Sequence, residues 1–538
     1  MEVKESKKFI QNSYILMVGY FLSTLVSTIG TILVIRLISV EEYGLISIAF
    51  IVPNILINFS ELGLNFASIH FIARKMGDND EGGVKNVIRI NLYIKILIGT
   101  LLTLFVAFFP SFIAHNIYNI RDDRMIILIQ IAAIGVISSI LHEALISFFL
   151  GAQDMNTIQY GSILRSFLRT STSIILILLG FTLLGPVIGF VLSTLITVIF
   201  YLFFLKRVYP KKDNRKSATK WKELSKMFKY GYPLMLGSFI AAIQNDIYFL
   251  ILTANGLIAE VSYLSVAITS AALIGILKKA ILNSLFPVFS KRDWSNESQR
   301  KSLVNYYQFS LKFEALLILP VAIFIILFSG NFFFIIFGDD YKIASPFISS
   351  YFLIYLLIPI GSITIPVFLN GQKKTNVVFL MELIIFMSSI IFSIVLIPFF
   401  GGLGLLFGIF LGRLVALIYG NIIIYKNYGT VLYGNLKNIF YVFFTAILSG
   451  IITYISYNFI TIFIPVDGLL NNILVLGIIF FIFLGLLLFF TGIFSLITYE
   501  EIDLMVTSFQ ILPIFNKIFY VIGEIEKRIL KIRSDSKK

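Results

Sequence analysis

Long apolar runs separated by short polar breaks dominate this chain. Residues 9–38 and 44–72 are each long enough to cross a bilayer as a helix, which takes about 20 apolar residues at about 1.5 Å of rise each. The break between them, Arg36-Leu-Ile-Ser-Val-Glu-Glu-Tyr43-Gly44, is short and acidic, as expected of a tight turn at a membrane surface. Much of the chain repeats this unit of helix, short turn, helix and then a basic loop.

Fourteen apolar segments of this kind can be marked along the sequence. They lie at residues 9–38, 44–72, 86–114, 125–151, 156–180, 184–206, 229–254, 260–289, 303–330, 343–370, 374–399, 403–425, 437–463 and 470–497. The runs are continuous rather than alternating, which favours helices over strands. We therefore predict an all-α polytopic membrane protein with fourteen transmembrane helices. The first run is too long for a signal-peptide core, so we expect it to be retained.

The composition agrees with this class and argues against an enzyme. Hydrophobic residues make up 58% of the chain and charged residues 13%, whereas soluble domains carry about 25% charged residues. Cysteine is absent, which excludes a disulfide framework, a thiol nucleophile and a thiolate metal site. The GxxxxGK[ST] phosphate loop is missing, and the three histidines lie on separate spans. We predict no catalytic site, no metal and no cofactor.

The net charge of +14 could suggest a nucleic-acid partner, but the distribution of the charges argues otherwise. When loops are assigned alternately from a cytosolic N-terminus, most lysines and arginines fall on the cytosolic side, above all in 206–229. The outer loops hold Arg121, Arg124 and Lys342. This bias predicts a multi-pass protein of the cytoplasmic membrane with both termini in the cytosol. The expected partners of the basic loops are anionic membrane lipids, not nucleic acid.

Two pairs of short matches indicate an internal repeat. Phe149-Leu-Gly-Ala-Gln153 and Phe368-Leu-Asn-Gly-Gln372 lie 219 positions apart, and Ser47-Ile-Ala49 and Ser265-Val-Ala267 lie 218 apart. The offset equals six helices, so the halves have the same orientation in the membrane. We predict two parallel six-helix lobes plus two extra C-terminal helices. The predicted parts are an N-terminal lobe at 1–206, a basic cytosolic linker at 207–228, a C-terminal lobe at 229–425, helices 13 and 14 at 437–497 and an amphipathic basic cytosolic tail at 498–538.

Several short motifs along the spans carry a family resemblance. They are Arg36 to Gly44, Glu61-Leu-Gly-Leu64, Tyr230-Gly-Tyr-Pro233 followed by Asp246, Phe286-Pro-Val-Phe289, Phe337-Gly-Asp-Asp-Tyr341 and Phe368 to Gln372. In this order the chain resembles the polysaccharide transporter family, oligosaccharide-lipid flippases of the multidrug/oligosaccharidyl-lipid/polysaccharide exporter (MOP) superfamily. A departure is Val261-Ser262-Tyr263, where the family more often has a glycine before the tyrosine. The resemblance implies alternating access and a lipid-diphosphate-linked oligosaccharide as cargo. We expect a monomer, with glycosyltransferases of the same pathway as partners.

Charged residues inside the spans need a reason, because each costs about 3 kcal/mol at the membrane centre on insertion scales. The cations are Arg36, Lys95, Arg165, Arg169, Lys278, Lys279, Lys312 and Arg413, and the acids are Glu61, Glu143, Asp246, Glu314 and Glu382. The first four cations and Lys312 lie within about ten residues of a span end, so we predict that they snorkel to headgroups.

The remaining cations, Lys278, Lys279 and Arg413, are the predicted substrate-binding residues. Lys278 and Arg413 lie about 18 Å above the cytosolic ends of their spans, near the membrane centre. Our hypothesis is that the three cations line a water-filled cavity and bind a diphosphate, for which arginine offers bidentate geometry. Asp246 and Glu61 are the predicted coupling or pairing acids. An Asp246–Lys278 pair that only joins two spans is an open alternative.

Other functions also stay open at this point. The leading prediction is a flippase that moves lipid-linked oligosaccharide to the outer leaflet for cell-surface polysaccharide or glycoprotein biosynthesis. The alternatives are a multidrug or other lipid-precursor exporter of the same superfamily, a membrane glycan polymerase or glycosyltransferase, and a scaffold for glycan assembly. A polymerase is expected to have a large outer loop, and no predicted outer loop exceeds about a dozen residues.

Overall fold

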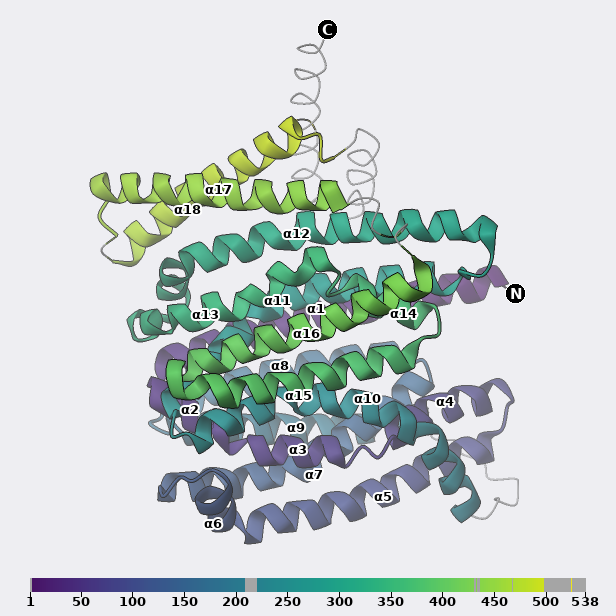
Figure 1. Cartoon of the computed structure of the whole chain (residues 1–538). Helices are drawn as coiled ribbons and strands as arrows, with labels where there is room; N and C mark the ends of the chain where they lie inside the picture. Colours follow the sequence, from purple (N-terminus) through teal and green to yellow (C-terminus); the bar gives the residue numbers. More distant parts are fainter. Residues whose placement is uncertain are drawn as a thin grey trace. The chain divides into compact units, whose positions relative to one another are not determined.

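The computed structural model describes residues 2–208, 220–429, 432, 436–466, 468–497 and 524. Some helical side chains within these ranges are also outside the description, Lys279 among them. The described residues are nearly all helical and contain no strand, which confirms the predicted all-α class (Figure 1). Residues 209–219 of the predicted linker and nearly all of the predicted tail lie outside the described residues.

The chain forms two compact units, Met1–Ser270 and Ala271–Lys538. The helices of the first unit are α1 (Glu2–Leu37), α2 (Val40–Ala49), α3 (Ile51–Phe59), α4 (Leu64–Gly77), α5 (Glu81–Phe108), α6 (Pro110–Phe112), η1 (Ile113–Ile117), α7 (Asp123–Gly151), α8 (Met155–Leu178), α9 (Leu184–Phe204), η2 (Leu205–Arg207), α10 (Lys220–Ala254) and the first part of α11 (Ile258–Ser290). The division into lobes at 1–206 and 229–425 stays a prediction.

The second unit begins within α11. Its further helices are α12 (Glu297–Phe337), η3 (Asp339–Ala344), α13 (Ser345–Phe352), η4 (Leu353–Ile360), α14 (Thr364–Gly371), α15 (Thr375–Phe400), α16 (Gly402–Tyr428), α17 (Leu436–Phe463) and α18 (Leu469–Ile493). In the described ranges, 12 helices are long and apolar enough to cross a membrane. Two shorter apolar stretches, Ser238–Ala254 and Ile258–Ala272, lie in α10 and α11. The total of fourteen crossings stays a prediction.

The acidic turn after the first span is a tight one, as predicted. Ser39 begins α2 with a capping box: its Oγ accepts from the Glu42 amide, and the Glu42 carboxylate accepts from the Ser39 amide at 2.9 Å. The same carboxylate accepts a hydrogen bond from Thr182 Oγ1 at 2.7 Å, which ties this turn to the one between α8 and α9. A cap of this kind stabilises a helix by about 1 kcal/mol.

Two predicted spans are broken rather than continuous. The helix expected over 44–72 ends at Phe59 and restarts at Leu64, because Leu62 (φ 46°) and Gly63 (φ 73°) adopt left-handed backbone conformations. The span expected over 343–370 divides into α13, η4 and α14 around Gly361 (φ 94°). Broken spans matter for function because they free backbone carbonyls inside the membrane.

The helix bounds repeat along the chain at an offset of about 219 positions. For example, α8 and α9 correspond to α15 and α16. Packing repeats as well, since Gly189 of α9 lies against Ser173 of α8, and Gly408 of α16 lies against Ser393 of α15. Small residues at both crossings let the helix backbones approach closely, which is how membrane helices gain contact area.

Two of the family motifs pack against each other in the second unit. The rings of Phe289 and Phe368 meet edge to face with centroids 5.3 Å apart. Gln372 donates from Nε2 to the Phe289 carbonyl at 2.8 Å and to the Arg292 carbonyl at 2.9 Å. These motifs therefore join α11 to α14 and have a structural role at this place.

Candidate functional site

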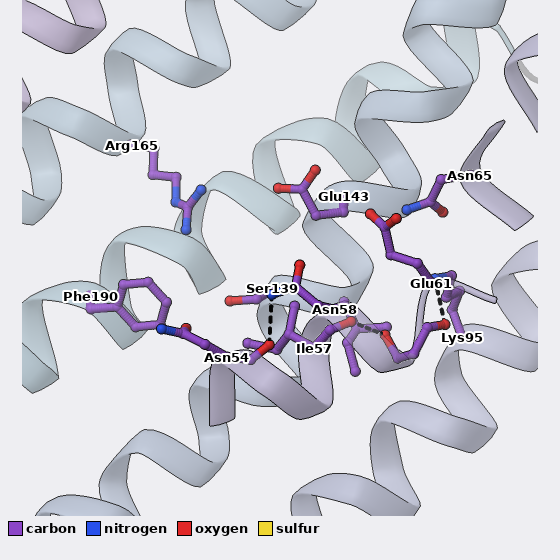
Figure 2. A pocket seen from close by; sticks show the side chains of 12 residues that line it. Asn54, Ile57, Asn58, Glu61, Asn65, Lys95, Ser139, Glu143, Arg165 and Phe190 are labelled. Carbon is purple, nitrogen blue, oxygen red and sulfur yellow. Dashed lines mark hydrogen bonds between the residues drawn. The ribbon is translucent and has the colours of Figure 1, made fainter. Parts of the chain in front are cut away.

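A cavity of about 300 Å³ lies inside the first unit, among α3, α4, α5, α7, α8 and α9. Its lining residues are Asn54, Ile57, Asn58, Ser60, Glu61, Asn65, Lys95, Ser139, Ile140, Glu143, Arg165 and Phe190 (Figure 2). Most of these side chains are polar, although the helices that carry them are apolar. Such a cavity can hold polar species within the membrane, because buried polar groups need partners.

Lys95 of α5 fills one end of the cavity. Its Nζ donates to the Ser60 carbonyl at 2.8 Å, and its side chain is 1% exposed. In a continuous helix the Leu64 amide would take that carbonyl. Here the Leu64 amide donates to the Glu61 carbonyl at 2.8 Å, so the lysine occupies the position that the break has opened. The snorkelling predicted for Lys95 is therefore wrong.

Two carboxylates lie near this ammonium group. Glu61, in the break, and Glu143, on α7, are both within electrostatic range of Lys95. Glu143 also contacts His142, with Oε1 3.3 Å from Nδ1, and 46% of its side chain is exposed at the cavity. Glu61 is a predicted site residue, whereas Glu143 is not. The signal for Glu143 was an acid within a long, largely apolar helix of 29 residues.

The other end of the cavity combines a cation, an aromatic ring and amides. Figure 2 shows Arg165 and Phe190 on the same side of the cavity, away from Lys95. The guanidinium carbon lies 5.6 Å from the ring centroid. Asn54 donates from Nδ2 to Asp246 Oδ1 at 3.2 Å, so the predicted acid Asp246, 7% exposed on α10, lies next to the cavity wall.

Two buried oxygen atoms of the wall have no hydrogen-bond partner among the described residues. They are Asn65 Oδ1 and Ser139 Oγ. Each such atom costs free energy when it stays unpaired in an apolar surrounding. A bound polar group or water in the cavity would satisfy them.

The second unit brings two of the predicted cations together. Lys278 lies within electrostatic range of Arg413 and of the acids Glu314 and Glu382. Glu314 is completely buried and accepts from Thr364 Oγ1 at 2.9 Å, just after the break at Gly361. Its other oxygen, Oε1, has no hydrogen-bond partner among the described residues, and neither has Arg413 Nε. The side chain of Lys279 lies outside the described ones.

Neither cluster has the donor set of a metal centre. Among the described residues, no group of three or more His, Asp or Glu side chains is arranged to hold a metal ion. The side chains of both clusters can form ion pairs and hydrogen bonds within the membrane-spanning units.

These features define a class: polytopic helical membrane proteins with recurring helix bounds, broken spans and charged side chains in their interior. The family model described as "Polysaccharide biosynthesis protein" matches residues 9–293, and this chain belongs to that family. The resemblance found in the sequence is thereby confirmed. An uncharacterized membrane protein of Methanocaldococcus jannaschii is 23% identical over 399 residues, which cover 72% of this chain and 78% of that protein.

Solved structures show the same fold. The lipid II flippase MurJ in an inward closed conformation matches with a TM-score of 0.70 at 18% identity, over 89% of this chain and 98% of MurJ. An inward-facing multidrug resistance MATE transporter of the MOP superfamily matches with a TM-score of 0.61 at 18% identity, over 78% of this chain and 96% of that one. At such identity the likeness establishes the fold: this chain has the fold of MOP superfamily transporters.

Proposed function

We propose that this protein is a flippase that carries a polyprenyl- or dolichyl-diphosphate-linked oligosaccharide across the cytoplasmic membrane by alternating access. The observation that carries the proposal is the charged interior of each unit. Side chains such as Lys95 and Glu314 are almost fully buried within spans, where charge is expensive. A helical protein that only anchors or scaffolds has no need for them.

The cargo is inferred from chemistry and kinship together. The family is one of polysaccharide biosynthesis proteins, and a protein of the same fold is named as a lipid II flippase. A diphosphate that leaves the headgroup layer needs cations, and Lys278, Lys279 and Arg413 are the proposed ligands. Asp246 and Glu61 are proposed as the acids that couple transport to an ion or stabilise the cations. In this role the protein is a carrier, and translocation requires no chemical change of the cargo.

The orientation follows from the distribution of basic residues. Both termini are placed in the cytosol, so the cargo is loaded from the cytosolic leaflet and released to the outer one. Glycosyltransferases that build the oligosaccharide on its lipid are the expected partners, and the carrier itself is expected to act as a monomer.

The test is a translocation assay on purified protein in vesicles. Lys278→Gln and Arg413→Gln are compared with wild type for movement of a fluorescent diphosphate-linked oligosaccharide lipid between leaflets. The matched control is Lys342→Gln, an exposed lysine in η3. We expect at least tenfold slower movement in the two interior variants and an unchanged rate in the control. Wild-type rates in both interior variants, with normal thermal unfolding, would contradict the assignment of these residues.

A second candidate function has one observation in its favour. The cavity of the first unit presents two carboxylates, Glu61 and Glu143, and acids of this kind suit organic cations. A multidrug exporter would use them. In the same vesicles, uptake of a lipophilic cation that depends on Glu143, without movement of the glycan lipid, would favour this candidate over the flippase.

A further inference from the structure

Two arginines stand over one aromatic ring in the first unit. Arg165 and Arg169 lie one turn apart on α8, and their guanidinium carbons are 5.6 Å and 5.3 Å from the ring centroid of Phe190 on α9. Like charges at this spacing repel each other. The ring attracts both, since an aromatic face carries negative potential. Phe50 packs edge-on against Phe190 with centroids 4.8 Å apart, which holds the ring in place.

Both arginines belong to the middle of a span. Arg165 is ten positions from the start of α8 at Met155, and Arg169 is nine from its end at Leu178. These separations correspond to about 15 Å and about 14 Å of helix rise. Snorkelling does not describe Arg165, which lines the internal cavity instead (Figure 2). Arg169 is exposed.

The acids around the two arginines are too few for both. Arg165 is within electrostatic range of Glu143, but that carboxylate also serves Lys95 and His142. In the described part of the chain, the titratable groups that act on Arg169 are Arg165 and the phenol of Tyr43, and Arg169 forms no ion pair there. The two guanidiniums therefore leave a surplus of positive charge inside the unit.

We propose that Arg165, Arg169 and Phe190 form an anion site that binds a phosphate or diphosphate group. Each guanidinium offers a planar fork that matches the oxygens of phosphate, and two forks one turn apart can hold two neighbouring oxygen pairs. The anion would supply the negative charge that the surrounding carboxylates lack. This inference rests on the proposed function and names residues of the first unit that bind the phosphate groups of the proposed cargo.

Either a lipid headgroup or a free phosphate compound can supply the bound anion, and the experiment distinguishes the two. Full-length protein in nanodiscs is titrated with inorganic pyrophosphate and, in a second arm, with a polyprenyl diphosphate placed in the bilayer. The variants are Arg165→Gln, Arg169→Gln and Phe190→Leu. The control is Arg207→Gln. The guanidinium carbon of Arg207 also lies over an aromatic ring, 4.4 Å from the Phe204 centroid, but Arg207 does not line the cavity.

We expect each arginine variant to bind the diphosphate about tenfold more weakly, since each loses charge-assisted hydrogen bonds, while the control stays within about twofold of wild type. Weaker binding of both probes would show that the site recognises the diphosphate group itself. Weaker binding of the polyprenyl diphosphate alone would show that the site recognises a lipid headgroup. Wild-type affinity of both arginine variants in both arms overturns the proposal.

A folding defect is separated from a binding defect by the conservative variants. Arg165→Lys and Arg169→Lys keep the charge over Phe190 but lose the fork, so we expect normal thermal unfolding with weakened diphosphate binding. Unaltered binding in these variants would contradict the bidentate site. Diphosphate binding that depends on Arg165 and Arg169, in a protein that moves no lipid-linked oligosaccharide, would support the site and overturn the proposed function.

Discussion

Ser47 of α2 and Ser265 of α11 are hydrogen-bonded to each other, with their Oγ atoms 3.4 Å apart, although 218 residues separate them. They are counterparts in the internal repeat, so two equivalent helices meet at equivalent residues. Ser265 also donates to the Tyr43 hydroxyl at 3.3 Å. Next to them, a Cβ on Gly44 would come within 2.6 Å of the Ile258 carbonyl, which shows how close the two backbones are.

This contact can be trapped with cysteines, because the natural chain has none. We expect Ser47→Cys combined with Ser265→Cys to form a disulfide on mild oxidation, since the side-chain atoms already touch. A protease site placed in the predicted linker 207–228 makes the cross-link visible on a non-reducing gel. If α2 and α11 must separate at this contact during transport, we expect the disulfide to stop translocation and a reductant to restore it.

Each single cysteine variant serves as the control for this trap. Neither can form the intramolecular bridge, so both should transport normally under oxidant. Failure of the double variant to cross-link, with both thiols open to a maleimide, would show that this contact does not persist in the membrane.

The sequence was sufficient for the all-α membrane class and for the family, because these depend on long apolar runs and on short motifs along them. The sequence was not sufficient to predict where the ammonium group of Lys95 lies. Its distance from a span end agrees with snorkelling, and only the break in another helix shows where the ammonium group goes. That break depends on positive φ angles at Leu62 and Gly63, which hydropathy does not record.

The same limit applied to the charged residues. Counting along the spans placed Lys278 and Arg413 near the membrane centre, and the structure puts them within electrostatic range of each other. Counting could not tell that Arg165 faces a cavity, because the rotation of α8 is set by the helices packed against it, mainly α1 and α9.

Replacement of Lys95 tests the link between the broken span and the cavity. Lys95→Met keeps the length of the side chain but leaves the Ser60 carbonyl and Glu61 without their cation. We expect a loss of about 2–3 kcal/mol in stability, since hydrogen bonds to charged groups are worth this much. The measurement is the unfolding midpoint in detergent. The double variant Lys95→Met with Glu61→Gln should recover part of the loss, because it also removes one uncompensated carboxylate.

Equal midpoints for wild type and Lys95→Met would mean that the buried ammonium contributes nothing at this place. If the double variant loses more stability than the two single variants lose together, Glu61 and Lys95 are not coupled in the expected sense.

Replacement of Gly63, the glycine of the break in the second span, tests whether the left-handed backbone there stabilises the fold. Gly63 has φ of 73°, and a Cβ there would collide with the backbone of Gly231 on α10. Gly63→Ala should therefore cost at least about 1–2 kcal/mol from the left-handed backbone alone, and more from the collision. Gly77, at the end of α4, has nothing within 4 Å of the corresponding Cβ and no positive φ. Gly77→Ala should leave the unfolding midpoint and the transport rate unchanged; a similar loss in both variants would exclude the proposed cause.

The repeat predicts a graded effect at its two small-residue crossings. A Cβ on Gly408 would lie 2.6 Å from the Ser393 amide nitrogen, whereas a Cβ on Gly189 would come no closer than 3.0 Å to the backbone of α8. Backbone cannot move as a side chain can, so Gly408→Ala should cost more than Gly189→Ala, within the range of about 1–3 kcal/mol usual for overpacking. Gly485 of α18 has open space at the same position, and Gly485→Ala should be neutral or slightly stabilising, because alanine is the better helix former. Unfolding midpoints of the three variants check the order. A midpoint for Gly485→Ala as low as that for Gly408→Ala would mean that close helix contact is not the reason for these glycines.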